Sequence, residues 1–343
     1  MSRSLSTSLG EAFEKALGRA LERVGRAYSE SLRLSYKLVG EAGNKRLLKP
    51  VHDISPPDAP VYGVDGSLAR VRLGSRMVAV LHAVSVKLPN GLTGEIRHEH
   101  IMSIIELPQA GIESEEALET GMIALETLML AYLAKNAENK ALIFIDGPLA
   151  DPPWQPKSTP VLWDIAGQLS ADHRVDADNI VNIHRWRRSV LAEFKDRVYG
   201  VVKRISSSRL LSFLGGLDDD DAILRSLLIG LKRRGLGPHY IHLAPLREGV
   251  YGVYGSIHAC YVLDTKHSSI YRLEMTHTEC EPAVQHSIAL TLPGHKLPLP
   301  ILLAHSYARI PHKLLERTLG MIVSDIAKEA GSFEEVIAFF DQT

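Results

Sequence analysis

Several features that mark particular protein classes are missing from this chain of 343 residues. It has only two cysteines, Cys260 and Cys280, with neither a C-x-x-C pair nor the spacing of a zinc site. So few cysteines are typical of a reducing cell interior rather than of a secreted, disulfide-rich protein. No uninterrupted apolar run reaches the ~18 residues of a membrane span, and residues 1–15 do not resemble a signal peptide. The sequence therefore predicts a cytoplasmic protein without a membrane segment.

An excess of one charge is also missing, because 39 Lys and Arg stand against 40 Asp and Glu, for a formal net charge of -1. A surface that binds nucleic acid would then have to be a local basic patch. There is no G-x-x-x-x-G-K loop, which argues against ATP hydrolysis by this chain itself. Apolar residues, in contrast, make up 45% of the sequence, enough to bury a sizeable core.

The apolar pattern changes near residue 55. Residues 9–39 place apolar side chains at helical spacing, which predicts a long amphipathic helix that packs on the same chain or docks on a partner. Residues 50–60 hold four prolines and predict a connector. We therefore divide the chain into an N-terminal helix with its linker, residues 1–55, and one α/β domain, residues 56–343.

The first half of that domain runs strand, strand, strand, helix, strand. The strands are predicted at 61–64, 77–88, 95–107 and 141–145, and the helix at 114–136, capped by Ser114. Three antiparallel strands followed by a helical crossover to a parallel strand are the opening order of the ribonuclease H fold. The predicted fold class is α/β: a ribonuclease H-like mixed sheet flanked by helices, with an N-terminal helix and helical insertions.

Further elements are predicted in the second half of the chain. They are helices at 165–194, 222–234 and 313–327, and strands at 197–204, 240–246, 257–263 and 269–275. The acidic run Asp218–Asp221 directly precedes a predicted helix, where acids suit the helix dipole, so we do not interpret it as a metal site.

Three acidic residues fall where this fold would bring them together. Asp65 follows the first strand and Asp146 follows the strand after the helix, and adjacent strand ends lie ~5 Å apart. Glu126 borders the apolar stripe of the helix, where a carboxylate is costly unless it is paired or binds a metal. Glu119, seven residues earlier on a similar face, remains the alternative, although it lies nearer the solvated helix start. Such oxygen donors suit Mg²⁺ or Mn²⁺ and favour phosphodiester hydrolysis assisted by two ions.

Ordinary explanations stand beside these interpretations. An Asp-Gly pair after a strand is a common turn. The interpretation as a metal site therefore depends on two such pairs occurring together with Glu126. The basic residues His184, Arg185, Arg187 and Arg188 surround the aromatic ring of Trp186, an arrangement that could hold single-stranded DNA or could simply be a solvated helix face.

Four motifs resemble the NurA family of nucleases. They are Val64–Ser67, Phe144–Leu149, Gly200–Arg204 followed by Ser206–Ser208, and Leu297–His305. Their order and spacing are more specific than any one of them. One departure is that Leu297 occupies the family's Tyr position, and Leu cannot donate a hydrogen bond. Either the activity is altered, or another hydroxyl such as that of Tyr271 or Tyr307 substitutes.

The resemblance implies a site and a reaction. Asp65, Glu126 and Asp146 would be the metal-binding acids for Mn²⁺ or Mg²⁺, with two ions expected. His305 would assist at the scissile phosphate or at a metal. Lys203 would face the active site or the DNA backbone, with Arg204 beside it.

The resemblance also implies a biological setting. It implies 5′ to 3′ exonuclease and single-strand endonuclease activity on DNA, a homodimer, and a hexameric HerA-type ATPase as partner in end resection during double-strand break repair. Two alternatives remain open. One is another ribonuclease H-like nuclease acting on RNA or junctions, and the other is a DNA-binding subunit with weakened catalysis, which Leu297 would favour.

Overall fold

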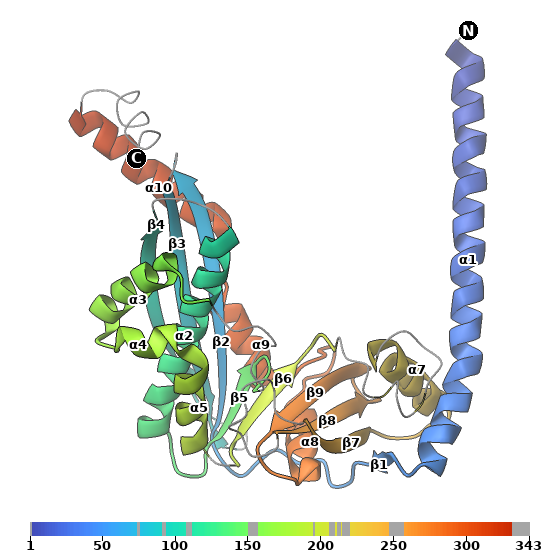
Figure 1. Cartoon of the computed structure of the whole chain (residues 1–343). Helices are drawn as coiled ribbons and strands as arrows, with labels where there is room; N and C mark the ends of the chain where they lie inside the picture. Colours follow the sequence, from blue (N-terminus) through green and yellow to red (C-terminus); the bar gives the residue numbers. More distant parts are fainter. Residues whose placement is uncertain are drawn as a thin grey trace. The chain divides into compact units, whose positions relative to one another are not determined.

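The structure is a computed structural model that describes residues 2–73, 76–90, 94–107, 112–149, 157–194, 196–205, 210, 214, 220–246 and 257–330. Its helices are α1 (Ser2–Asn44), α2 (Ile112–Asn136), α3 (Pro160–His173), α4 (Ala177–Val181), α5 (Ile183–Glu193), α7 (Asp220–Arg233), α8 (Cys280–Ala289), α9 (Leu299–Ala308) and α10 (His312–Ala330). Its strands are β1 (Leu48–Pro50), β2 (Val61–Leu73), β3 (Arg76–Leu88), β4 (Arg97–Leu107), β5 (Leu142–Asp146), β6 (Val198–Val202), β7 (His239–Leu246), β8 (Ile257–Asp264) and β9 (Ser269–Met275) (Figure 1).

The described strands form one sheet in the order β1-β7-β8-β9-β6-β5-β2-β3-β4. Strands β2, β3 and β4 are antiparallel neighbours, whereas β5 pairs with β2 in parallel and β6 pairs with β5 in parallel. The strands β4-β3-β2-β5-β6 thus follow the order expected for a ribonuclease H-like sheet, and the predicted mixed α/β class is confirmed.

Strand β2 differs from its prediction in length. The sequence suggested that it ends before Asp65, but β2 continues to Leu73 because β3 pairs with it along its whole length. The parallel partner β5 stops earlier, since the last pair is Val64 with Ile145. Asp65 therefore lies within a strand, at the point where one of its two neighbouring strands ends.

Three helical predictions also need correction. Helix α2 begins at Ile112, so Ser114 lies inside its first turn instead of capping it. The helix predicted over 165–194 is divided into α3, α4 and α5, because Arg174 adopts a left-handed conformation with φ 56° after α3. Helix α9 was missed, since Pro298 and Pro300 resemble helix breakers, although proline is well tolerated in a first turn.

The two faces of β2 and β3 are covered by different helices. Helix α2 packs on one face and contributes Leu118, Leu125 and Met129 to the main core. Helix α9 packs on the other face, where Ala304 and Ala308 contact Val84 and Val86. By length and composition the span Glu113–Asn136 of α2 could cross a membrane, but 61% of its apolar window is buried in this core, which accounts for its composition.

The chain divides into two compact units, and we describe each by itself. Unit 1 consists of residues 1–51, 204–242 and 261–271, and unit 2 consists of residues 52–203, 243–260 and 272–343. In unit 1, α1 packs on α7 near its C-terminal end, whereas Phe13, Leu17 and Val24 nearer its start are exposed. In unit 2, Cys260 and Cys280 form a disulfide that the sequence pattern did not indicate. The predicted division near residue 55 stays a prediction.

Candidate active site

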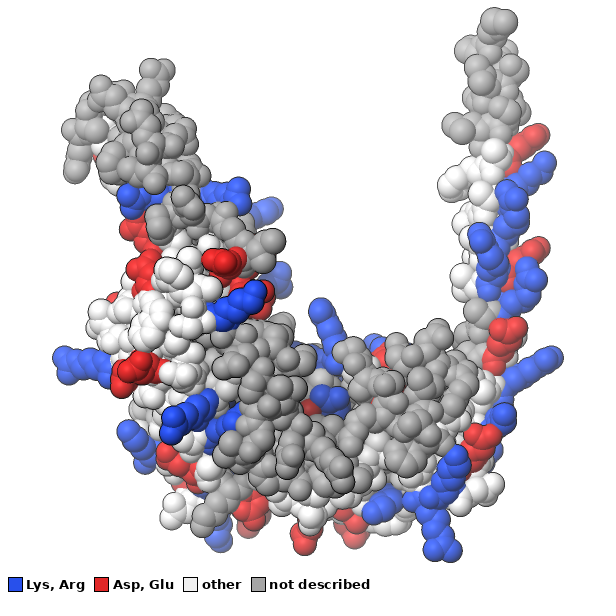
Figure 2. Space-filling model, viewed as in Figure 1, with Lys and Arg blue, Asp and Glu red and all other residues white. Residues whose placement is uncertain are grey.

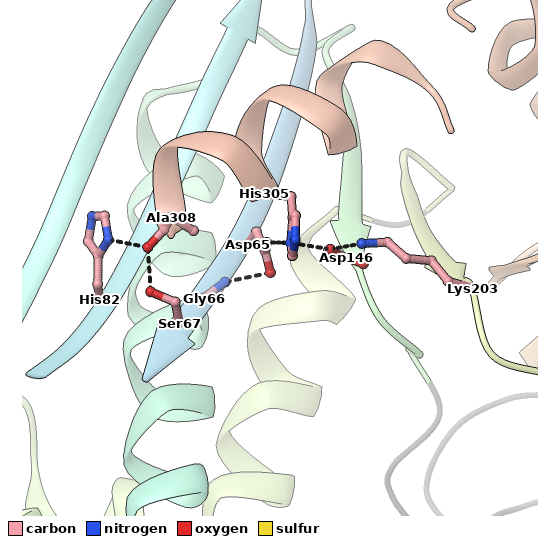
Figure 3. A network of polar contacts seen from close by, with 8 residues as sticks. All are labelled: Asp65, Gly66, Ser67, His82, Asp146, Lys203, His305 and Ala308. Atoms are coloured by element: carbon pink, nitrogen blue, oxygen red, sulfur yellow. Dashed lines mark hydrogen bonds and ion pairs between the residues drawn. The ribbon is translucent and has the colours of Figure 1, made fainter. Parts of the chain in front are cut away.

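Asp65, Asp146 and His305 meet on one face of the sheet in unit 2. Asp65 comes from the middle of β2, Asp146 from the end of β5, and His305 from α9 (Figure 3). The imidazole Nδ1 of His305 lies 2.9 Å from Oδ2 of Asp65 and 3.4 Å from Oδ2 of Asp146. Both carboxylates are nearly buried, with about a tenth of each side chain exposed, whereas 62% of the His305 side chain is exposed. The site is therefore open to solvent on the imidazole side.

Glu126 approaches the same point from the opposite face of the sheet. It is buried, and a Cβ placed on Gly66 would lie only 2.7 Å from its Oε1. The missing side chain at Gly66 thus leaves the space that the Glu126 carboxylate fills. Nη1 of Arg187, from α5, donates a hydrogen bond of 3.1 Å to Oε2 of Glu126, and both side chains are about nine-tenths buried. This ion pair compensates a carboxylate that would otherwise be costly in the core.

Asp146 is held differently, by a turn and a lysine. Gly147 adopts φ +137°, which a residue with a side chain rarely reaches, so the chain can turn directly after the strand. The turn rests on Gly200 of β6, where a Cβ would lie 2.7 Å from the Gly147 carbonyl oxygen. Lys203, just beyond β6, forms an ion pair with Asp146 (Figure 3). These contacts explain why the Gly-Val-x-Lys pattern follows the second Asp-Gly pair.

Burial and neighbouring acids both raise pKa values in this site. Burial, reinforced by the charges of Asp146 and Glu126, raises the pKa of Asp65 from 3.8 to about 8. Lys203 and the backbone amide of Gly66 act in the opposite direction, because each stabilises the ionised carboxylate. Burial also raises the pKa of Glu126, while Arg187 opposes that change. Glu126 and Asp146 each have a cationic partner, so Asp65 is the carboxylate that a further cation would stabilise most in its ionised form.

The donor set fits a divalent cation. One carboxylate oxygen from each of Asp65 and Asp146 and one imidazole nitrogen of His305 lie within 4.8 Å of one another. Oxygen and nitrogen donors of this kind suit Mn²⁺ well, and carboxylates also suit Mg²⁺. The three groups lie close enough together to hold one metal ion, and Glu126 adds a third carboxylate from the other face of the sheet.

Comparison with known proteins decides the family. A family model described as the NurA domain matches residues 39–310 of the chain. The chain belongs to the NurA family. It is therefore a nuclease of that family, as the motif resemblance predicted. No curated protein sequence matched the chain.

Solved NurA structures share the fold. The NurA nuclease from Sulfolobus solfataricus is 14% identical, with 92% of this chain and 98% of that chain covered and a TM-score of 0.62. A NurA structure bound to dAMP and manganese is 15% identical, with 90% and 97% covered and a TM-score of 0.58. At this identity the likeness shows a common NurA fold, which agrees with the strand order described above.

The residues that the sequence left as alternatives around the NurA motifs lie in different environments. Glu119 is exposed on α2, whereas Glu126 is buried beside Gly66. Leu297 is half-buried just before α9. Of the two candidate hydroxyl groups, Tyr271 is fully buried, while Tyr307 is exposed on the same helix as His305.

The remaining candidates lie as follows. Arg185 and Arg204 are exposed, Arg188 is half-buried, and Trp186 packs against the main core. Asp220 is buried in the first turn of α7 and accepts a hydrogen bond of 2.8 Å from the amide of Leu210. Ser206–Ser208, Asp218 and Asp219 lie outside the described residues. The surface in Figure 2 shows acidic and basic side chains interspersed, as the near-zero net charge suggests.

The supporting roles of two residues were missed. Arg187 was counted among the possible DNA contacts, but it is buried beside Glu126, and Glu274 was not singled out at all. Arg187 is spaced four residues after Ile183 and three before Val190, so it lies on the buried stripe of α5, and that position was the available signal. Glu274 is fully buried in β9, forms an ion pair with Arg272 and accepts a hydrogen bond of 2.8 Å from the amide of Leu149. Its carboxylate thus holds the loop that follows Asp146.

Proposed function

We propose that this NurA nuclease binds Mn²⁺ or Mg²⁺ through Asp65, Asp146 and His305 and hydrolyses DNA phosphodiesters at that point. The observation that carries the proposal is the meeting of these three ligand groups within 4.8 Å. A bound cation would offset the charge of the phosphate and activate a water molecule. The NurA structure with dAMP and manganese supports the choice of metal and of a nucleotide substrate.

The chain's own residues have distinct roles in this proposal. Asp65 and Asp146 supply the negative charge that a cation needs, and Glu126 adds to that charge because it lies close enough to raise the pKa of Asp65. The exposed imidazole of His305 faces the solvent from which the phosphate would arrive. Lys203 stabilises ionised Asp146 and is itself about a third exposed, so its ammonium can also attract the DNA backbone.

The finer activity follows from family membership. We propose 5′ to 3′ exonuclease and single-strand endonuclease activity, two metal ions, a homodimer, and a cytoplasmic role in DNA end resection during double-strand break repair. A hexameric HerA-type ATPase would supply the motor, since this chain has no phosphate-binding loop. Arg185, Trp186, Arg188 and Arg204 stay candidate DNA contacts, and the number of metal ions stays a prediction.

A cleavage assay tests the proposal. Purified wild type and Asp146→Ala are incubated with end-labelled single-stranded and duplex DNA, with and without Mn²⁺. We expect metal-dependent cleavage by wild type and a loss of more than about 100-fold in the variant, beyond the usual effect of removing an outer-shell partner. Asp164→Ala, which removes an exposed carboxylate from α3, is the matched control and should cleave normally. Retained activity in folded Asp146→Ala would refute the site.

The same assay separates the alternative functions. Preferential cleavage of RNA or of junctions would favour a different ribonuclease H-like nuclease. Binding of DNA by wild type without cleavage at any metal concentration would favour a weakened subunit. Leu297 supports that second reading, because it removes the hydroxyl that the family pattern carries before the helix of His305.

A further inference from the structure

The C-terminal end of α9 has an unusual cap. The last carbonyl groups of a helix have no partner within the helix and need donors from elsewhere. The carbonyl oxygen of Ala308, the last residue of α9, accepts two side-chain hydrogen bonds, one from Oγ of Ser67 and one of 2.9 Å from Nδ1 of His82 (Figure 3). Both donors come from the sheet, one from β2 and one from β3.

This cap lies one helical turn from His305. Ser67 follows Asp65 by two residues, so its side chain lies on the same face of β2 as the Asp65 carboxylate. The other end of α9 packs closely on β2, because a Cβ on Gly63 would lie 2.1 Å from the carbonyl oxygen of Pro300. Hydrogen bonds at one end and close packing at the other therefore position the helix relative to Asp65.

The role of His82 is determined by its neighbours. A carbonyl oxygen can only accept, so Nδ1 of His82 must carry a proton. Its Nε2 lies 2.8 Å from Nδ1 of His100, and Nε2 of His100 lies 3.0 Å from Nδ1 of His98. When all three imidazoles are neutral, Nδ1–H of His98 donates to Nε2 of His100, and Nδ1–H of His100 donates to Nε2 of His82. These bonds keep the buried His82 ring in the orientation that reaches Ala308. His82 is 4% exposed, so water does not compete easily for these bonds.

We infer that Ser67 and His82 are positioning residues that place the His305 imidazole beside Asp65 and Asp146 by jointly capping α9. The inference rests on the proposed function, because it assigns His305 to the cation site. It gives a physical reason for Ser67, the fourth residue of the Val-Asp-Gly-Ser motif. The hydroxyl of Ser67 is not among the ligand groups of the cluster. It also brings into the site His82, which belongs to none of the motifs.

A double-mutant cycle on Mn²⁺ affinity tests this inference. Ser67→Ala and His82→Phe are each made in wild type and in His305→Ala, and Mn²⁺ binding to the full chain is measured by electron paramagnetic resonance. In the wild-type background we expect a loss of about tenfold, the size typical of groups that orient a metal ligand. In the His305→Ala background the same changes should alter the affinity by less than about twofold. Ser67→Thr, which keeps the hydroxyl, should restore binding.

Ser103 offers a matched control. It is a buried serine whose hydroxyl donates a hydrogen bond of 2.6 Å to Oδ2 of Asp172, near the end of α3. This bond also connects a helix to the sheet, but α3 carries none of the proposed site residues. Ser103→Ala should leave Mn²⁺ affinity unchanged. Should His82→Phe fail to fold by circular dichroism, the Ser67 variants carry the test.

The outcomes are distinguishable. An equal loss of affinity in both backgrounds, or none in folded Ser67→Ala, would overturn the inference and make the cap a stabilising contact only. If wild type itself binds no Mn²⁺, the proposed function fails and the inference with it. If wild type binds Mn²⁺, His305→Ala weakens that binding and Ser67→Ala does not, the function stands and the inference is wrong.

Discussion

The two Asp-Gly pairs of this NurA protein are alike in sequence and unlike in structure. Asp65-Gly66 lies within β2, which continues for several residues because β3 pairs with it throughout. Asp146-Gly147 ends β5 and turns the chain away at φ +137°. Gly66 is needed for the space that Glu126 fills, and Gly147 for its backbone conformation. The same dipeptide thus meets two different physical requirements.

The two aspartates differ in their compensation as well. Asp146 is paired with Lys203, whose ammonium is a permanent counter-charge beside it. Asp65 has the Gly66 amide at 2.9 Å and the His305 imidazole beside it. Its burial, together with the two neighbouring acids, nevertheless raises its pKa to about 8. Because its pKa is raised, Asp65 must lose a proton when a metal binds near neutral pH.

The largest expected effect concerns the buried pair behind Gly66. Arg187→Met leaves Glu126 buried without its counter-charge and should lower the free energy of unfolding by about 3–5 kcal/mol. Arg70 pairs at 2.7 Å with Glu115 in the first turn of α2, and about half of each side chain is exposed. Arg70→Met should therefore cost less than about 1 kcal/mol. Urea unfolding of both variants measures the difference, and equal losses would contradict the role given to burial.

Replacing each aspartate should change metal-free stability in opposite directions. Asp65→Asn removes a buried carboxylate that other acids oppose, and should stabilise the protein at pH 7 by on the order of 2 kcal/mol. Asp146→Asn breaks the ion pair with Lys203 and should not stabilise it. Thermal unfolding in EDTA provides the measurement. A lower melting temperature for Asp65→Asn would show that its hydrogen bonds outweigh the repulsion.

The pH dependence should carry the same signature. The folded pKa of Asp65 is raised to about 8, whereas its unfolded pKa is near 4, so the folded state holds the proton over this range. The stability from this group is present below pH 4 and declines as the pH rises to about 8, by at most about 1.4 kcal/mol per unit. Asp65→Asn should flatten this slope in metal-free protein. An unchanged slope would place the proton elsewhere.

Effects of similar or smaller size separate the two glycines. Gly147→Ala forces an alanine to φ +137° and should cost about 1–3 kcal/mol of stability. Gly66→Ala would place a Cβ 2.7 Å from Oε1 and 2.8 Å from Cγ of the buried Glu126. It should therefore displace that carboxylate and weaken Mn²⁺ binding. Urea unfolding and Mn²⁺ titration of both variants measure the two effects. Normal Mn²⁺ binding by Gly66→Ala would contradict this prediction.

Much of this arrangement could be predicted from local patterns. The apolar strands and the crossover helix fix the sheet order, and that order alone brings Asp65 and Asp146 to neighbouring positions. Glu126 could be singled out because it borders the apolar stripe of α2. The helical spacing of apolar residues in the sequence shows which positions will be buried.

Long-range packing accounts for what could not be predicted. The continuation of β2 depends on pairing with β3, and two residues that look like a turn can lie inside a strand when a partner covers them. Helix α9 was hidden by its prolines, and the contact of His82 with Ala308 joins residues 226 positions apart. Arg187 matters only because α5 packs on α2.

One binding measurement addresses the central statement that Asp65 and Asp146 serve a single cation site. Mn²⁺ is titrated at pH 8 into wild type, Asp65→Asn and Asp146→Asn, and free Mn²⁺ is followed by electron paramagnetic resonance. The account predicts that either substitution alone removes the tight binding seen in wild type. Wild-type affinity in either folded variant would contradict it, because the two carboxylates would then not hold the same ion.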